Sequence, residues 1–316
     1  MTLLKMTSTS GRSPSRWWRL QSKYAPYLFV SPFVILFSVF LLYPLGRSLW
    51  LAFHKTVGPR REVFVGLDNF SFLLSDRLFW LSVANTSAYA IGYVLLQIPV
   101  ALGLALILNG DRVRCRSFFR FAFFSTHLVG GVFVAVLFSQ VLATDTGLLN
   151  RVLSFVASPF TSQPVAIAWL DTPYLTVVVL IMASLWLNAG WGMVYFLAAL
   201  QAVDPELYEA AEVDGASPAQ RLWHVTLPGI RHVLAFMAIT GLIGGFQLFE
   251  LSYILYGQTS GPLSSGLTIV MYLFNVGFGV GDLGYASAVG WALVVIVLVV
   301  SVAQWWLGRL ASRGLS

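Results

Sequence analysis

Long apolar runs separated by short polar stretches dominate the chain, and this pattern predicts membrane-spanning helices. A helix needs about 20 consecutive apolar residues to cross the hydrocarbon layer of a bilayer. We therefore expect an all-α membrane protein with about six transmembrane helices in a region of residues 27–308, between tails of residues 1–26 and 309–316. The predicted spans are 27–46, 82–108, 121–142, 174–200, 233–256 and 285–307.

Two stretches between these spans are ambiguous. Residues 152–170 carry no charge, but two prolines and a run of Ser and Thr argue against a seventh span. Residues 257–284 are rich in Gly and contain SGPLSSG followed by TIVMYLFNVGF, which favours a loop with a short interfacial helix. The sequence leaves open whether 152–170 or 264–278 form interfacial helices.

One polar segment, Leu200 to Pro228, lies between the fourth and fifth predicted spans. Its first part predicts a short helix, because Asp204 can cap the N-terminus and Pro205 suits the first helical position. Gly215 is suited to end that helix.

The same segment predicts a second short helix. Ser217, Pro218 and Gln220 match a Ser-x-x-Gln capping box with proline at the first position, and we expect Pro228 to end the helix. A helix–glycine–helix unit between two apolar spans indicates an element that another protein grips from outside the bilayer.

Composition supports the membrane class. Hydrophobic residues make up 58% of the chain and charged residues 10%, against about 25% charged in soluble domains. The single cysteine, Cys115, excludes an internal disulfide and a cysteine metal cluster, so no metal is expected.

The basic residues favour one orientation. With the N-terminus inside, 13 of the 19 Lys and Arg residues fall in cytoplasmic segments and six in outer segments. The positive-inside rule then places both termini and the polar segment in the cytoplasm, and the formal charge of +6 needs no nucleic-acid partner. A cleavable signal peptide is the competing interpretation of the N-terminus, but the first apolar run is long enough to span and lacks a clean cleavage site.

The polar segment resembles the cytoplasmic EAA loop of ABC importer permeases, EAA-x3-G-x9-I-x-L-P. Glu-Ala-Ala at 209–211, Gly215 and Val-Thr-Leu-Pro at 225–228 match it, with Val225 in place of Ile. The resemblance implies a coupling helix in residues 201–231 that docks on an ATPase subunit; the competing interpretation is an ordinary soluble loop. The coupling residues it implies are Glu209, Ala210, Ala211, Asp214, Gly215, Leu227 and Pro228.

Further stretches are similar to the carbohydrate-importer branch of these permeases, which also takes up sn-glycerol 3-phosphate. They are FVGLDNF, the Asn85-Thr86 pair, SFFRFAFF, FQLFELSYIL and GDLGYASA. The resemblance implies a type I importer permease in a bacterial or archaeal plasma membrane. It also implies a pore shared with a second permease, two ATPase subunits and an extracytoplasmic binding protein.

The chain contains no Gly-x4-Gly-Lys-Ser/Thr phosphate-binding loop. We therefore expect no ATP hydrolysis, no catalytic residues and no cofactor in this chain. ATP and Mg²⁺ are expected in the partner ATPase.

The predicted spans contain one charged side chain, Glu250. A charge inside a span costs about 2.5 kcal/mol or more, so Glu250 should face water or another subunit. Gln247 and Tyr253, one helical turn to either side, would share its face and form a stripe suited to sugar hydroxyls. The alternative places Glu250 near the outer membrane surface or against the partner permease.

Asn188 and Tyr195 in the fourth span are the next candidates for the substrate path, although hydrogen bonding between helices would also explain them. His127 in the third span is interpreted as a packed histidine.

The cargo interpretation has competitors. A phosphate-ester importer, for sn-glycerol 3-phosphate or a related polyol ester, should show arginines in the pore, and a cation importer should show several acids. An ion-coupled secondary transporter is a remote alternative, because the spans lack paired charges. The sequence names neither the sugar nor its contact residues nor the partner subunits.

Overall fold

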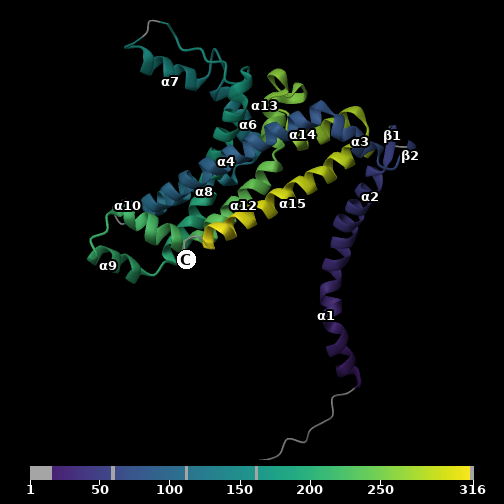
Figure 1. Cartoon of the computed structure of the whole chain (residues 1–316), viewed down its shortest axis with the longest axis horizontal. Helices are drawn as coiled ribbons and strands as arrows, with labels where there is room; N and C mark the ends of the chain where they lie inside the picture. The colour runs from purple at the N-terminus through teal and green to yellow at the C-terminus, as the bar shows by residue number, and fades with distance from the viewer. Residues whose placement is uncertain (1–15, 58–60, 111–112, 161–162, 314–316) are drawn as a thin grey trace, which may run out of the picture. The chain divides into compact units, whose positions relative to one another are not determined.

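The computed structural model describes residues 16–57, 61–110, 113–160 and 163–313, which are mainly helical (Figure 1). The chain divides into two compact units, Met1–Trp50 and Leu51–Ser316, and each is described by itself.

The first unit contains a long apolar helix. It is built from α1 (Arg16–Phe37), a π-helical turn, η1 (Ser38–Leu42), and α2 (Tyr43–Ala52). The π turn precedes Pro44, and a wider turn relieves the clash between a proline ring and the carbonyl four residues earlier. The span-length part, Lys23–Ala52, includes the predicted span 27–46. Its length and apolar composition suit a membrane span.

The second unit is organised around α4 (Arg77–Asn109) and α8 (Pro173–Gln201), which form the most extensive helix pair. Gln97 contacts Asn188 and Ala101 lies beside Gly192, so the two helices run in the same direction. Two transmembrane helices that run in the same direction must be separated along the chain by an odd number of membrane crossings. This supports one crossing in residues 116–141.

That third span is not the continuous helix predicted over 121–142. It consists of α5 (Arg116–Ser125), a 3₁₀ turn, η2 (Thr126–Leu128), and α6 (Gly131–Val141), and the two halves are bent by 99°. The break occurs where Gly130 adopts an extended backbone conformation and caps the new helix that begins at Gly131. Apolar length alone does not reveal such a break.

The predicted fifth span, 233–256, is also broken. α12 (Arg231–Phe246) ends at Gln247, and α13 (Glu250–Tyr256) begins after Phe249, whose φ of −134° and ψ of −63° are not helical. Gly245 in the last turn of α12 lies against Ala90 of α4, where a Cβ atom would lie 2.8 Å from the Ala90 Cβ. Close backbone packing at this point thus accompanies the end of α12.

The sixth predicted span, 285–307, lies within α15 (Leu283–Arg313). Asp282 caps this helix, because its Oδ1 atom accepts a hydrogen bond from the Tyr285 backbone N–H at 3.0 Å. The Gln304 side chain donates to the Ala238 carbonyl oxygen of α12 at 3.4 Å, so the C-terminal part of α15 lies beside α12. The C-terminal end of α15 therefore lies near the polar segment (Figure 1).

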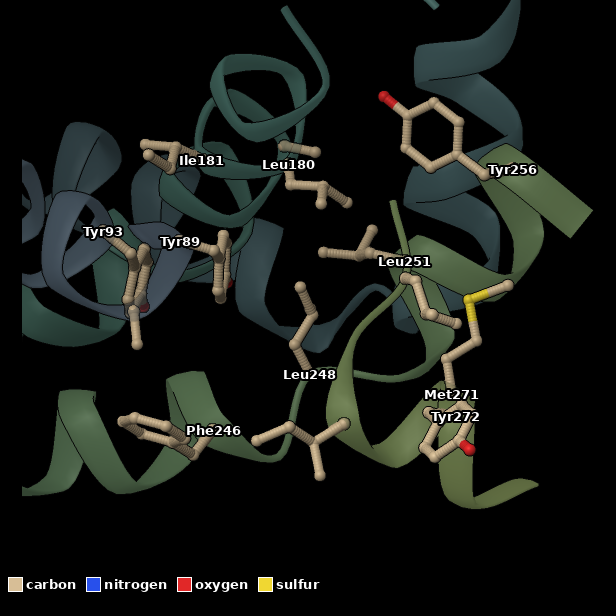
Figure 2. Packing of buried hydrophobic residues seen from close by; sticks show 14 of the residues in the cluster. Tyr89, Tyr93, Leu180, Ile181, Phe246, Leu248, Leu251, Tyr256, Met271 and Tyr272 are labelled. Atoms are coloured by element: carbon tan, nitrogen blue, oxygen red, sulfur yellow. The ribbon is translucent and has the colours of Figure 1, made fainter. Parts of the chain in front are cut away.

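Most buried apolar side chains belong to one large cluster between these helices (Figure 2). It combines residues of α4, α6, α8, α12, α13 and α15 with α14 (Ile269–Phe274). A smaller cluster joins the later halves of α4 and α8 to the start of α12. Representative members of the larger cluster are Tyr89, Tyr93, Leu180, Ile181, Phe246, Leu248, Leu251, Tyr256, Met271 and Tyr272.

A two-stranded antiparallel hairpin, β1 (His54–Val57) and β2 (Arg61–Phe64), departs from the all-helical prediction. It is followed by α3 (Asp68–Ser75), which begins within the FVGLDNF stretch. The Asn69 amide donates to the carbonyl oxygens of Ala52 and His54 at 2.9 and 3.0 Å. Part of this stretch therefore has a structural role.

The two ambiguous stretches adopt different structures. In the first, α7 (Leu148–Ala157) is too short to span. Asn150 of this helix hydrogen-bonds to the chain on both sides of it: its amide donates to the carbonyl oxygens of Thr144 and Ile167, and its Oδ1 atom accepts from the indole N–H of Trp169. The second contains the 3₁₀ turns η4 (Gly257–Thr259) and η5 (Pro262–Ser264), followed by α14 and a π-helical turn, η6 (Asn275–Val280). Both stretches thus contain short helices.

Candidate functional site

The polar segment forms a helical hairpin, defined here as residues 204–229. Its first helix is α9 (Pro205–Val213), and the Asp204 carboxylate accepts the Glu206 N–H at 3.0 Å, as the predicted cap requires. Gly215 has a φ of +75°, and its N–H donates to the Glu212 carbonyl while the next N–H, of Ala216, donates to Ala211. These two bonds close the helix in a Schellman motif, for which glycine is the favoured residue.

The second helix starts with the predicted capping box. The Ser217 N–H donates to the Gln220 side chain at 2.7 Å, and the Gln220 N–H donates to the Ser217 hydroxyl at 3.4 Å. The helix then passes through α10 (Pro218–Arg221), the π turn η3 (Leu222–Thr226) and α11 (Leu227–Gly229).

The prediction that Pro228 ends this helix was wrong. The helix continues to Gly229, because the preceding π turn widens the backbone where the proline ring would otherwise meet a carbonyl. The chain then bends by 71° into α12.

Side-chain contacts tie the two halves of the hairpin together. Arg221 pairs with Glu212 at 3.1 Å, and the hydroxyls of Tyr208 and Thr226 are 3.1 Å apart. These contacts hold the two halves of the hairpin together between α8 and α12.

The outer face of the hairpin is available to a partner. Glu209, Ala210, Asp214, Gly215 and Pro228 are exposed, and Ala211 and Leu227 are half-buried. Three large apolar side chains that the sequence interpretation omitted lie on the same hairpin, and they are 53%, 88% and 67% exposed: Leu207, Val213 and Trp223. The sequence could have identified these three residues, because each is a large apolar side chain within an otherwise polar loop.

A second feature, the central cavity, lies where the third and fifth spans break. Its volume is about 590 Å³, and it is bordered by α4, α8, α12, the start of α13 and the bend between α5 and α6. Its polar and aromatic lining residues include Tyr89, Tyr93, Gln97, His127, Ser184, Asn188, Trp191, Thr240, Gln247 and Glu250.

Three of the five predicted path residues, Asn188, Gln247 and Glu250, line this cavity. Tyr253 instead stacks on Phe249, with ring centroids 5.2 Å apart. The predicted stripe from Gln247 through Tyr253 was wrong, because the helix is interrupted between Gln247 and Glu250 and its regular face is lost.

Tyr195 also lies outside the cavity lining. Its ring packs against Trp191 at 4.6 Å and against Phe236 at 5.6 Å. It therefore supports the neighbouring Trp191, which does line the cavity.

Sequence reasoning missed a row of polar groups on α4. Tyr89, Tyr93 and Gln97 are spaced four residues apart, so they lie on one face of the helix, and this spacing could have identified them. The Tyr89 hydroxyl lies 2.7 Å from the Ser184 hydroxyl. The buried Gln97 Oε1 atom has no hydrogen-bond partner. His127, interpreted from the sequence as a packed residue, also borders the cavity.

The cavity lining combines neutral hydrogen-bonding groups and aromatic rings with one carboxylate, that of Glu250, and contains no Lys or Arg. Gly131 leaves room for this carboxylate, because a Cβ atom there would lie 2.7 Å from Glu250 Oε2. Within the described residues no group of three or more His, Cys, Asp or Glu side chains could hold a metal ion. The arrangement suits a polar, uncharged ligand with an apolar face.

Fold, hairpin and cavity together define a polytopic transport protein. The profile of the family described as binding-protein-dependent transport system inner membrane component matches residues 93–313, and the chain belongs to this family. It is a transport subunit of an ABC importer and not an enzyme, and it is a multi-pass inner-membrane protein.

Relatives match nearly the whole chain. The arabinooligosaccharides transport system permease protein AraP of Bacillus subtilis (strain 168) is 35% identical over 280 residues, covering 88% of this chain and 87% of AraP. The lactose transport system permease protein LacF of Rhizobium radiobacter is 34% identical over 305 residues, covering 96% of this chain and 99% of LacF.

Solved structures share the fold. A chain in the crystal structure of a bacterial ABC transporter involved in the import of the acidic polysaccharide alginate matches with a TM-score of 0.78 and 25% identity. That match covers 93% of this chain and 99% of the other. A chain of the bacterial alginate ABC transporter in complex with alginate pentasaccharide-bound periplasmic protein matches with a TM-score of 0.75 and 25% identity, covering 92% and 95%.

Proposed function

We propose that this chain forms half of the translocation pore of an ATP-driven importer for a sugar or oligosaccharide delivered by an extracytoplasmic binding protein. The observation that carries the cargo class is the central cavity, where neutral donors and acceptors surround aromatic rings. Relatives named for arabinooligosaccharide and lactose transport support the same class. A phosphate ester such as sn-glycerol 3-phosphate is less well supported, because no Lys or Arg lines this cavity.

The partner subunits follow from surfaces that the chain leaves uncovered. The helix of Lys23–Ala52 is apolar and long enough to span, which suits contact with lipid and with a second, homologous permease. The hairpin offers Glu209 beside exposed apolar side chains such as Trp223, a combination suited to a cleft on an ATPase subunit. Two such ATPase subunits would bind the ATP and Mg²⁺ for the whole complex.

We propose an orientation in which the hairpin and both termini lie on the cytoplasmic side of a bacterial or archaeal plasma membrane. The distribution of Lys and Arg supports this side. The end of α15 near the hairpin fits the same assignment, because the C-terminal tail and the hairpin then share one compartment.

The mechanism is a rocking of helices around the cavity. Closure of the ATPase pair would move both permease hairpins, and the braced hairpin would carry that displacement into α8 and α12. Both helices line the cavity, so their movement would switch its opening between the two sides of the membrane.

Reconstitution tests this proposal. Proteoliposomes containing both permeases and the ATPase, supplied with the binding protein, should take up labelled arabinotriose or lactose only when ATP and Mg²⁺ are on the hairpin side. Uptake by the permease pair without the ATPase would overturn the energy source. Uptake of sn-glycerol 3-phosphate but of no sugar would overturn the cargo class.

A further inference from the structure

A second cavity of about 690 Å³ lies at the end of α8 opposite the hairpin. It is bordered by the end of α6, the turn after it, the residues before α8 and the loop that follows α13. We propose that this outer cavity is an entry subsite that binds hydroxyl groups of the carbohydrate cargo before the cargo reaches the central cavity. The inference rests on the proposed function and adds a site to it.

The base of the outer cavity is built around Tyr256. Its ring lies between two glycines of the following loop, because Cβ atoms at Gly261 and Gly266 would each come within 2.8 Å of ring carbons. Gly261 also has a φ of +73°, which favours glycine. The glycine-rich loop is therefore shaped to hold this one aromatic side chain.

The loop itself is anchored to α4. The Asn85 amide donates to the carbonyl oxygens of Ser264 and Leu267 at 2.9 and 3.1 Å, and the Thr86 hydroxyl accepts the Ile269 N–H at 3.0 Å. The Asn85-Thr86 pair thus fixes the loop that encloses Tyr256. A site built on such a loop is preorganised.

The Tyr256 side chain is buried, and the residue as a whole is only 7% exposed. The hydroxyl group close enough to interact with the Tyr256 hydroxyl is that of Thr176. Figure 2 shows this hydroxyl directed away from Leu251 and Met271, and the outer cavity borders the residue. Thr176, which lies nearby, already shares a hydrogen bond with Ser265 at 2.7 Å. Because the Tyr256 hydroxyl is itself inaccessible, Tyr256 forms the base of the cavity, and the cargo would meet the carboxylates and hydroxyls of the other lining residues.

The rest of the lining has the chemistry of a polyol site. The carboxylates of Asp145 and Asp171 can each accept O–H groups, and Ser and Thr side chains surround them: Ser139, Thr144, Thr146 and Thr259. No Lys or Arg borders this cavity, so an anionic ligand would meet only repulsion. A metal ion is not favoured, since the described residues contain no group of three His, Cys, Asp or Glu ligands.

A short helix connects the two cavities. Glu250, the first residue of α13, borders the central cavity, and Tyr256, the last, borders the outer one. Seven residues of helix rise about 10 Å. A cargo of two or three sugar units bound at the outer cavity would therefore be long enough to reach the polar groups of the central cavity.

Cysteine labelling of the assembled importer tests occupancy. Cys115, which is exposed, is first replaced by Ser, and Thr146→Cys then places one thiol at the outer cavity. Free lactose or arabinotriose should slow labelling by a membrane-impermeant maleimide added from the outside. Leu148→Cys is the matched control, because Leu148 is exposed two residues away but does not line the cavity, and its labelling should not change.

Transport kinetics supply a second readout. Asp171→Asn should raise the half-saturating cargo concentration about tenfold and leave the maximal rate unchanged, because it weakens a charged hydrogen bond made before the transport step.

The outcomes separate the two proposals. Sugar import with no protection at Thr146→Cys and unchanged half-saturation in Asp171→Asn would overturn the outer subsite alone. Labelling that responds to Ca²⁺ and not to sugar would replace it with a cation site. Absence of any ATP-dependent sugar import by the wild-type complex would overturn the proposed function itself.

Discussion

The hairpin and the central cavity are stabilised over very different distances along the chain. The hairpin is closed by contacts such as Tyr208 with Thr226, 18 residues apart, and Glu212 with Arg221, nine residues apart. The cavity depends on contacts such as Tyr89 with Ser184, 95 residues apart and on different helices. A locally closed unit can move without changing shape, whereas a cavity between helices changes shape whenever the helices move.

This difference suits the two tasks. In the proposed mechanism, the hairpin must remain rigid while an ATPase subunit displaces it, and the central cavity must open and close. The break at Gly130 and the one between Gln247 and Glu250 lie at the cavity, so irregular backbone borders an internal space there. The following predictions test whether the hairpin acts as a rigid unit and the cavity as an adjustable one.

The largest effect is expected from Gly215→Pro. Proline fixes φ near −65°, but Gly215 has a φ of +75°, so the turn between the hairpin helices cannot form. ATP-dependent uptake should fall to background while the amount of chain in the membrane stays normal, measured by transport and immunoblot of membranes. Gly46→Ala is the control, since a Cβ atom there meets nothing within 4 Å. Normal transport by Gly215→Pro would contradict the lever role.

A smaller but clear effect is expected from Glu250→Ala. Loss of the only carboxylate of the central cavity should raise the half-saturating sugar concentration about tenfold, the size expected for one hydrogen bond to a charged group. The measurement is uptake at varied concentrations of the loaded binding protein. Tyr253→Phe, which alters a neighbour outside the cavity lining, should leave the kinetics unchanged. Identical kinetics of Glu250→Ala for every sugar would remove Glu250 from the path.

A stability effect is expected at Asp76, the N-cap of α4. Burial raises the pKa of this carboxyl, but hydrogen bonds from Tyr272, Tyr285 and the backbone N–H groups of Leu78 and Phe79 outweigh burial and lower the pKa below its usual value. A lowered folded-state pKa means that the stabilisation is complete above the unfolded-state pKa of about 4 and is lost as the pH falls through the folded-state pKa.

Thermal unfolding of the purified chain in detergent between pH 3 and 7 measures this dependence. Asp76→Asn should be less stable at pH 7 and should lose less stability than wild type on acidification. Asp68→Asn, at an exposed carboxyl in the first turn of α3, is the matched control. Equal pH dependence of Asp76→Asn and wild type would contradict a stabilising role for the hydrogen bonds that Tyr272 of α14 and Tyr285 of α15 donate to Asp76.

The smallest effect is expected from Arg221→Ala. The Arg221–Glu212 pair lies at the surface, with the two side chains 28% and 74% exposed, and surface pairs contribute about 0–1 kcal/mol. Uptake should stay within about twofold of wild type, because the caps and the Tyr208–Thr226 contact still close the hairpin. Loss of uptake would show that this pair contacts the partner and does more than brace the hairpin.

Some features of this protein were determined by the sequence alone. Helix caps at Asp204, Gly215 and Ser217 were predicted and are present, because a cap depends on residues only two to five positions apart. The spans within α4, α8 and α15 were also predicted, since crossing a bilayer requires only a sufficient apolar length.

Tertiary structure decided the breaks and the cavities. The break at Gly130 and the one between Gln247 and Glu250 interrupt apolar runs that no local pattern divides, and they moved Tyr253 away from the path. The buried Tyr256 ring and the α4 row beginning at Tyr89 acquired their surroundings only from segments distant in the sequence. Polar groups in an apolar span are specified by what packs opposite them, and that partner lies tens to hundreds of residues away in the chain.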